Sequence, residues 1–505
     1  MYCAAYDLPA ANRVPFELWS LISSEFSTQE LARYCGVTRS LFEIAMEKMY
    51  RRLNVCSFDW PWCERFEEAL SNPIVASRVR SLGLDMRSAL HMTRPEFREK
   101  YCLRRGKAGA SFTEQDMFRE VVRGFESIEA LNLCSCQVHC DSLRTSLLQQ
   151  TSCLVKVFAE VLPKLKILNL QVQPETFIEL VDAAIDAWPS VSLQLQELSI
   201  TLDSGLYASS ERFCESLAKL VDKVSHCLTS FKLIAPYDNI HVPHRFFTFL
   251  GRSRLPHLSK IWFGLHTRPH YNSVPNLDGI NMFLRNHAAQ LQELHLTFYQ
   301  RGTLALPPPP LLAWYQRCFQ GVATGAKLEK LWLGACHPQE LVPLYGSVLG
   351  PVCPSVTSLV CVRTQVDYDQ LEALLSMPSC AQLKSLVLYY RGILTRQLAE
   401  LFASKCPQLE QLCIRYERST YKQEAPFQSV FRSQPWQAIE GREEWSYKVF
   451  LVWPQGLYMK LARGSCTNCV EQLMPVDMQV YGYTCETCAK PEDDESSRQN
   501  QCVVQ

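Results

Sequence analysis

A short pattern of apolar residues recurs along most of the chain. Each copy has an apolar residue, two intervening residues, a second apolar residue, one intervening residue and a third apolar residue. From Leu170 to Ile414 the copies follow one another at an average of about 30 residues, near the period of roughly 20–29 residues of one class of repeat protein. Eleven copies are present: Val79-Leu82-Leu84, Ile128-Leu131-Leu133, Leu165-Leu168-Leu170, Leu195-Leu198-Ile200, Leu228-Phe231-Leu233, Leu258-Ile261-Phe263, Leu291-Leu294-Leu296, Leu328-Leu331-Leu333, Val356-Leu359-Cys361, Leu383-Leu386-Leu388 and Leu409-Leu412-Ile414.

The spacing inside each copy predicts a strand. The last two apolar positions are two residues apart, so both side chains point to the same face of an extended strand. One strand cannot bury that face alone, whereas stacked copies form a parallel sheet over a continuous core. The segments between copies can hold a helix on the other side, and apolar residues recur at helical spacing within 177–185 and 398–402.

This repeat resembles the leucine-rich repeat. The resemblance implies an α/β solenoid over residues 57–440, with parallel strands on the concave face and helices on the convex face. Outward strand residues would then select a binding partner, and Trp, Tyr and Arg are frequent hot spots at such surfaces. The candidate binding residues are Trp262, His295, Trp332, Tyr389 and Arg415. Packing of the two tryptophans under loops or on neighbouring strands is the alternative.

Residues 14–56 predict three short helices. Pro15 suits the first turn of a helix, because its missing N–H group is not needed there. Ser27 and Glu30 can form a capping box for the second helix, and Thr38 or Ser40 can cap the third. The first helix carries an apolar stripe at helical spacing, made by Leu18, Leu21, Ile22 and Phe26. So small a core gains stability by docking on another surface.

The same segment carries a family resemblance. Val14-Pro15-Phe16-Glu17-Leu18-Trp19-Ser20-Leu21-Ile22, then Glu30-Leu31-Ala32-Arg33 and finally Met49-Tyr50-Arg51-Arg52-Leu53, resemble the F-box in its fungal form. Val14 stands where a leucine usually precedes the proline, and Thr28 stands where an acidic residue is common. The resemblance implies contact with the Skp-type adaptor of a cullin–RING ubiquitin ligase through Pro15, Leu18, Ile22, Phe26, Leu31 and Val37.

Composition and the absence of known motifs argue against several other classes of function. The 505 residues include 51 Lys plus Arg and 51 Asp plus Glu, so the net charge favours neither nucleic acid nor an anionic membrane. We find no glycine-rich phosphate loop, no His-Glu-x-x-His motif and no nucleophile elbow, and expect a non-catalytic protein. Neither a signal peptide nor a membrane-spanning apolar run is evident. We therefore expect a cytoplasmic or nuclear protein whose 23 cysteines are mostly reduced and pack as small apolar side chains.

Four cysteines near the C-terminus form two C-x-x-C pairs, Cys466 with Cys469 and Cys485 with Cys488. This spacing is typical of a four-thiolate zinc site, which would be closed and structural. Free thiols are the alternative in a chain so rich in cysteine. Alternating apolar residues after Trp445 predict strands, so residues 441–488 are expected to cap the array. No other cofactor is required.

The two ends of the chain are expected to lie outside the folded core. Residues 1–13 form an N-terminal arm, and residues 489–505 have the polar composition of a disordered tail. The chain ends in Cys502-Val503-Val504-Gln505, which matches a prenylation signal with glutamine favouring farnesyl. No basic stretch accompanies Cys502, and one lipid anchors only weakly. A chance match is the alternative.

Two functions follow from these features. In the first, the chain is the substrate-recognition subunit of a cullin–RING ubiquitin ligase, with the helices binding the adaptor and the repeats binding a protein substrate. In the second, it is a leucine-rich-repeat scaffold outside any ligase, whose N-terminal helices cap the array. This scaffold could be tethered weakly to a membrane through a prenylated Cys502.

Overall fold

The computed structural model divides the chain into two compact units. Unit 1 comprises Met1–Thr267 and Pro275–Phe283, and unit 2 comprises Arg268–Val274 and Leu284–Gln505. The division falls inside the region predicted as one repeat array. The structure describes residues 14–55, 72–85, 125, 127–134, 165–187, 194–202, 210–235, 247–248, 250–251, 253–267, 278–300, 327–334, 355–392, 396–417, 445–452 and 456–463. The predicted arm at 1–13 and tail at 489–505 lie outside them.

The N-terminal module, residues 14–50, consists of three helices: α1 (Phe16–Ser24), α2 (Thr28–Tyr34) and α3 (Arg39–Tyr50). Both predicted caps are confirmed. Ser27 and Glu30 exchange hydrogen bonds as a capping box, and the Thr38 hydroxyl accepts from the Leu41 N–H group at 3.0 Å. The hydrogen bond from the Ser27 backbone lowers the pKa of Glu30. These local bonds satisfy N–H groups that a helix start leaves unpaired.

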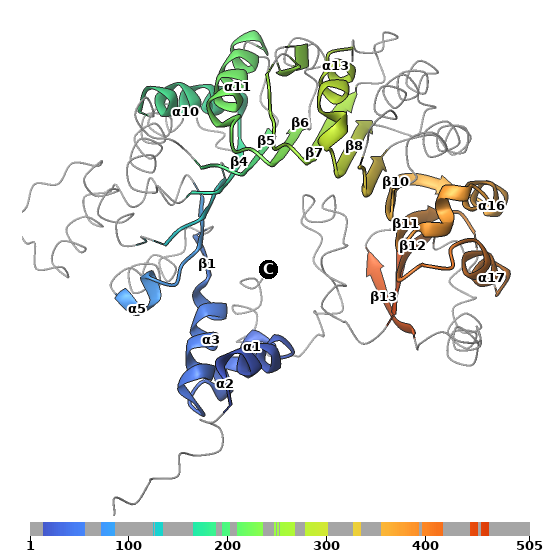
Figure 1. The fold of residues 1–505 in the computed structure, drawn as a ribbon, viewed down its shortest axis with the longest axis horizontal. Coiled ribbons are helices and arrows are strands. Elements are labelled where there is room, and N and C mark those ends of the chain that lie inside the picture. Colours follow the sequence, from blue (N-terminus) through green and yellow to red (C-terminus); the bar gives the residue numbers. More distant parts are fainter. Residues whose placement is uncertain are drawn as a thin grey trace, which may run out of the picture. The chain divides into compact units, whose positions relative to one another are not determined.

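In the part of unit 1 that the structure describes, there are seven parallel strands. Each strand pairs with the next one along the chain (Figure 1). They are β1 (Arg52–Val55), β2 (Ser81–Asp85), β3 (Ala130–Cys134), β4 (Ile167–Val172), β5 (Glu197–Leu202), β6 (Ser230–Ala235) and β7 (Lys260–Thr267). Six of them carry the predicted apolar copies. The first, β1, was not predicted; it follows α3 directly and belongs to a segment that we expected to be helical.

Helices connect several of these strands: α5 (Pro73–Ala76), α10 (Pro174–Ala187) and α11 (Ser210–Val224). Helix α13 (Asp278–His287) follows β7. The rings of Phe177 on α10 and Phe213 on α11 are 5.0 Å apart, and Asp182 accepts hydrogen bonds from Arg212 and Ser216. Helices α10 and α11 therefore pack side by side (Figure 1). Phe177 is fully buried, as the predicted helical spacing requires.

Unit 2 contains five further parallel strands: β8 (Glu293–Gln300), β9 (Lys330–Gly334), β10 (Ser358–Val366), β11 (Ser385–Tyr390) and β12 (Gln411–Glu417). Its helices are η2 (Ala288–Gln290), α16 (Tyr368–Leu375), η3 (Pro378–Gln382) and α17 (Arg396–Lys405). An antiparallel hairpin of β13 (Trp445–Val452) and β14 (Gly456–Arg463) follows, and β14 pairs with β12. The predicted terminal strands are thus confirmed, and they cover the edge of β12.

A repeated backbone contact sets the register between successive strands within each unit. Two consecutive N–H groups at the start of one strand donate to a single carbonyl just before the preceding strand. Arg80 and Ser81 donate to Arg51 O at 2.9 Å each, and the same arrangement recurs at β3 to β7 and at β9 to β12. Because the register is constant, equivalent residues of successive copies lie opposite one another.

The predicted core is confirmed at every position of the eleven copies. All 33 side chains are buried, with at most 7% of the surface exposed. In unit 1 the aromatic rings of Phe231, Phe247, Phe263 and Phe283 add a cluster in which Phe247 and Phe263 are 4.6 Å apart. The class shown is α/β with parallel strands and connecting helices. No helix within the described ranges is long and apolar enough to cross a membrane.

We expect Leu198→Ala to destabilise the protein by about 2–5 kcal/mol, because it removes a fully enclosed side chain and leaves a cavity. Urea unfolding followed by circular dichroism measures the change in the free energy of unfolding. Glu197→Ala, on the same strand but exposed, is the matched control and should change it by less than about 0.5 kcal/mol. Equal effects of both substitutions would contradict the assignment of faces.

Candidate protein-docking surfaces

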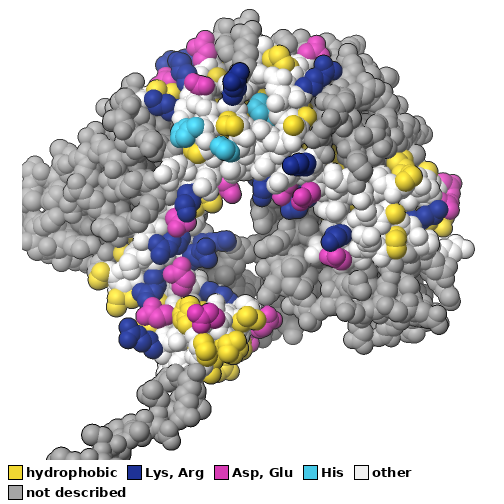
Figure 2. All heavy atoms as spheres, viewed as in Figure 1, with side chains coloured by type: hydrophobic (Ala, Val, Ile, Leu, Met, Phe, Trp, Pro, Cys, Tyr) yellow, Lys and Arg dark blue, Asp and Glu magenta, His cyan; other side chains and the backbone are white. Residues whose placement is uncertain are grey.

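The N-terminal module exposes an unusual amount of apolar surface. Leu21 is 69% exposed and Val37 is 58% exposed. Large apolar side chains on all three helices are exposed, and Figure 2 shows hydrophobic groups gathered on the module. We call this set the apolar patch: Phe16, Leu18, Leu21, Ile22, Tyr34, Val37, Phe42 and Met49. Contiguous apolar surface on a soluble protein usually marks a site of interaction.

The structure sorts the predicted adaptor-binding residues into two groups. Pro15, Leu18, Ile22 and Val37 are exposed. Phe26 is partly buried against the module's core, and Leu31 is fully buried within it beside Leu41 and Ala45. We correct the prediction for Leu31: its side chain faces its own helices and cannot contact a partner. Five further residues of the patch were not among the implied adaptor contacts, although helical spacing was the available signal: Phe16, Leu21, Tyr34, Phe42 and Met49.

Polar contacts join the helices of the module to one another. The Lys48 ammonium on α3 donates to the carbonyls of Ser23 at 2.7 Å and Phe26 at 3.4 Å, where α1 ends. A cation suits the carbonyl end of a helix. The apolar patch is therefore carried on helices that are tied to one another by more than their small core.

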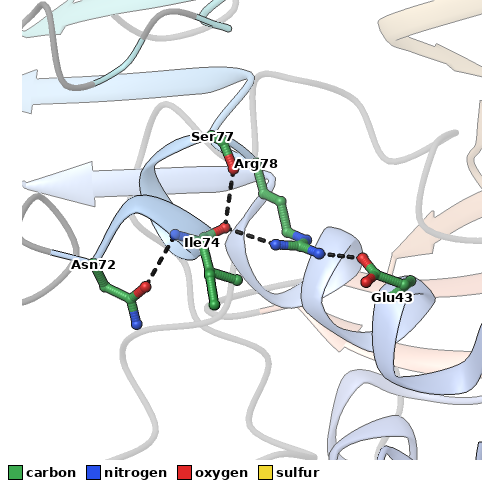
Figure 3. A network of polar contacts seen from close by, with 5 residues as sticks. All are labelled: Glu43, Asn72, Ile74, Ser77 and Arg78. Atoms are coloured by element: carbon green, nitrogen blue, oxygen red, sulfur yellow. Dashed lines mark hydrogen bonds and ion pairs between the residues drawn. The ribbon is translucent and has the colours of Figure 1, made fainter. Parts of the chain in front are cut away.

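A second network joins the module to the first repeat (Figure 3). Arg78, which follows α5, pairs with Glu43 on α3 and also donates to the Ile74 carbonyl at 2.8 Å. The Asn72 side chain caps α5 by accepting from the Ile74 N–H group at 3.0 Å, and the Ser77 hydroxyl donates to the Ile74 carbonyl. Together with β1, this network fixes the module against strand β2.

The outward side of unit 1 presents one residue from each strand between its two inward apolar positions. These residues lie in register and form what we call the outward column of unit 1: Asn54, Gly83, Asn132, Asn169, Ser199, Lys232 and Trp262. The Asn169 amide donates to the Asn132 carboxamide oxygen, and the Asn132 amide donates to the Ser81 hydroxyl at 3.2 Å. The Lys232 ammonium lies 3.9 Å from the centre of the Trp262 ring.

The equivalent column of unit 2 is aromatic and then apolar. His295 and Trp332 are stacked, with ring centres 5.0 Å apart and an angle of 27° between their planes. Both are half-buried, as is Tyr389. Arg415 lies opposite Tyr389 in the β11–β12 register, and its side chain lies outside the described part. The next three positions of the column are buried: Val360, Val387 and Cys413.

The candidate binding residues are thus grouped in three places. Trp262 contacts Lys232 in unit 1, His295 contacts Trp332 in unit 2, and Tyr389 and Arg415 are neighbours by register in unit 2. Each tryptophan contacts a side chain from the adjacent strand, as the alternative prediction of packing on neighbouring strands expected. Contact with a partner stays a prediction.

The four cysteines proposed for zinc and the prenylation candidate Cys502 all lie outside the described residues. Among the residues that are described, no group of three or more His, Cys, Asp or Glu side chains is arranged to hold a metal ion. Five described cysteines are buried, as expected for cysteines that pack as small apolar groups: Cys214, Cys361, Cys380, Cys406 and Cys413.

Comparisons with known proteins add little. Neither the family models nor the curated proteins give a match. Among solved structures, one match is the crystal structure of a Bacteroides thetaiotaomicron VPI-5482 protein proposed to be an alpha-L-fucosidase. It shares 11% identity and covers 54% of this chain and 92% of its own, with a TM-score of 0.19. A TM-score this low carries no argument about fold or activity.

Burial raises the pKa of the Cys380 thiol to about 11. Since the ordinary value is 9.0, the reactive thiolate at pH 8 should be about a hundredfold scarcer than for a free cysteine. Iodoacetamide labelling with peptide mass spectrometry should find Cys380 nearly unmodified in the native protein, with a rate that still rises above pH 9. The same thiol in urea is the control. Equal labelling in both states would contradict the burial of Cys380.

Proposed function

We propose that this chain is a non-catalytic substrate-recognition subunit of a cullin–RING ubiquitin ligase, an F-box protein with leucine-rich repeats. The N-terminal module binds a Skp-type adaptor through the apolar patch, and the repeats bind the protein to be ubiquitinated. The observation that carries the proposal is the patch itself, which includes three of the six residues that the F-box resemblance implies as adaptor contacts: Leu18, Ile22 and Val37.

The free energy gained by burying apolar side chains favours a partner that covers the apolar patch. Burying one Leu, Ile or Phe side chain is worth about 1.5–3 kcal/mol, so several such groups supply a substantial drive for association. The described buried apolar residues of the module are few: Leu31, Leu41, Ile44 and Ala45, with three partly buried residues packed against this core. It can bury few of its apolar residues internally, and a partner surface provides what the core cannot.

The attachment of the module to unit 1 also suits this role. A ligase subunit must hold its substrate at a defined position relative to the adaptor. The Arg78–Glu43 pair and the pairing of β1 with β2 fix the module against the first repeat, which supports such a fixed geometry.

The same attachment favours a second candidate function. A repeat array needs a terminal element that covers its first strand. Strand β1 covers β2, so the module can serve as the cap of a scaffold that belongs to no ligase. In that case prenylation of Cys502 would add weak membrane tethering. The scaffold reading leaves the apolar patch unexplained, and for this reason we rank it second.

The C-terminal cysteines are proposed to bind one structural zinc ion. Purified protein should contain about one zinc per chain by elemental analysis, the ratio that four thiolates around one ion define. Cys485→Ser should lose the metal, since three thiolates leave the site open. Cys35→Ser, a change in the N-terminal module, is the control and should retain it. A metal-free wild type would leave these cysteines as ordinary thiols.

The main test is co-purification of the full chain with a Skp-type adaptor. Leu21→Asp should weaken binding at least about tenfold, because it places a charge on the apolar patch that the adaptor would cover. Ile74→Asp is a matched control, since Ile74 is an exposed apolar residue, 51% accessible, outside the module. It should bind like the wild type. A wild-type chain that fails to bind the adaptor would reject the ligase role and favour the scaffold.

A further inference from the structure

We propose that residues 470–484 of this chain lie across the outward side of unit 2 and cover Val360, Val387 and Cys413, which we call the apolar row. The inference goes beyond the proposed function, because it assigns a segment of the chain itself, and not a partner, to part of the repeat surface. Three observations carry it: the burial of the row, a shielded hydroxyl group beside the row, and the directions in which the chain crosses the sheet of unit 2.

The apolar row is buried although it lies on the side of the sheet that faces away from the core. Its residues pair in register on β10, β11 and β12, and each lies between two inward residues of its own strand. Their exposed fractions are only 7%, 4% and 5%. Inward side chains cannot shield them, because successive side chains of a strand point to opposite faces. Trp332 adjoins the row at Val360, but it lies three strands, about 14 Å, from Cys413. Further atoms must therefore lie over the row.

The equivalent positions of unit 1 show that this burial is not a consequence of strand geometry. Ser199 has a smaller side chain than valine and is still partly exposed. The Asn54 side chain lies over Gly83, where an added Cβ atom would collide with it, and Asn54 is exposed. The strands of both units pair in the same parallel arrangement. The two columns therefore differ in what lies over the sheet, and not in the sheet itself.

A hydroxyl group beside the row is also shielded from water. Ser385 precedes the inward Leu386 on β11, so its side chain lies on the outward side, two residues before Val387. Its Oγ atom is buried and makes no hydrogen bond. Burying a hydroxyl group without a partner costs free energy, and this group would be hydrated on an open sheet. A peptide main chain lying over the row excludes water here and also offers Ser385 a hydrogen-bonding partner.

The directions of the strands show which segment of unit 2 is available to cover the row. Strands β8 to β12 are parallel, and crossovers between parallel strands are right-handed, so they pass over one side of the sheet. This is the side of α16 and α17 (Figure 1). Strand β13 is also parallel to β12, since both are antiparallel to β14. We therefore expect the connection 418–444 to cross the helix side too, which leaves the residues after β14 for the outward side.

The residues after β14 begin near the row and have a suitable sequence. Strand β14 ends at Arg463 and pairs with β12, the strand that carries Cys413. Apolar residues alternate with polar ones from Val476 through Met478 to Val480, a pattern typical of an extended segment with one apolar side. Such a segment covers roughly 13 Å from Val476 to Val480, and the row, three adjacent strands wide, covers about 10 Å. The 13 residues from Arg463 to Val476 reach up to roughly 43 Å, which is ample.

This arrangement limits what unit 2 offers to a partner protein. The half-buried His295 and Trp332 stay accessible, whereas the apolar row is reached only after residues 470–484 are displaced. A partner that binds the row must therefore compete with a segment of the same chain, whose effective concentration is high because it is covalently attached.

The first test uses the full chain and the Cys413 thiol as a reporter, because a buried thiol reacts slowly. Combining Val476→Asp with Met478→Asp should raise the rate of N-ethylmaleimide labelling of Cys413 at least about tenfold, since charges are not stable on an apolar row. Peptide mass spectrometry measures the rate. Cys361, buried on the inward side of β10, should stay protected. Val503→Asp with Val504→Asp, the same number of charges outside 470–484, is the matched control and should leave Cys413 protected.

The second test identifies the segment directly. Tyr389 is partly exposed on the outward side of β11, so Tyr389→p-benzoylphenylalanine places a photoreactive group beside the row with little change in size. Irradiation of the full chain should cross-link this position to residues 470–484 of the same chain. A cross-link to another segment, a cross-linked dimer, no cross-link at all, or unchanged labelling of Cys413 in the Val476→Asp and Met478→Asp variant would overturn the inference. If Cys361 is labelled as fast as Cys413, the variant is unfolded and the cross-link decides. Neither test involves the adaptor, so the ligase role is judged separately.

Discussion

The constant register between successive strands is the constraint on which the rest of the structure depends. At β2 to β7 and β9 to β12, two consecutive N–H groups at the start of the strand donate to one carbonyl just before the preceding strand. A shift of one residue would exchange the inward and outward faces, because side chains alternate along a strand. Leu198 would then point to water and Ser199 into the core. The apolar copies make that shift costly, and the paired backbone bonds leave few alternatives. Segments of very different length can therefore be inserted between strands without disturbing the core.

The same register creates the outward columns. The inward positions hold leucine and other apolar residues. The residue between them points away from the core, so its type can vary without disturbing the packing. In unit 1 this position changes from amides to a lysine and a tryptophan, and in unit 2 from stacked aromatic rings to buried Val360, Val387 and Cys413. The column of unit 1 is thus polar along most of its length, while the residues at one end of the column of unit 2 are apolar and buried. The outward surface therefore differs between the units although their strands are built alike.

The repeat itself could be predicted because its signal is both periodic and local: every inward position of the eleven copies is buried. Strand β1 was missed because it has only four residues, follows α3 directly and contains two apolar residues instead of three. Leu31 was misassigned for a different reason. Helical spacing identifies apolar residues that share a face, but not whether that face meets the molecule's own core or a partner. The distinction depends on how three helices pack, which no single helix encodes. The Asn54–Gly83 contact likewise joins two strands separated by a long segment and has no signature in either.

The N-terminal module shows why a small helical unit leaves apolar side chains exposed. Three helices whose buried apolar residues are Leu31, Leu41, Ile44 and Ala45 cannot enclose all the apolar side chains that their stripes contain, so several remain in water. A larger core would enclose this surface. Contacts that do not involve the patch also stabilise the module. They are the caps at Ser27 and Thr38, the hydrogen bonds from Lys48 to the end of α1, and the Glu43–Arg78 pair. All of these are polar and lie at helix ends or at the junction with the repeats. Polar contacts hold the helices in place, and the apolar residues of the patch remain exposed.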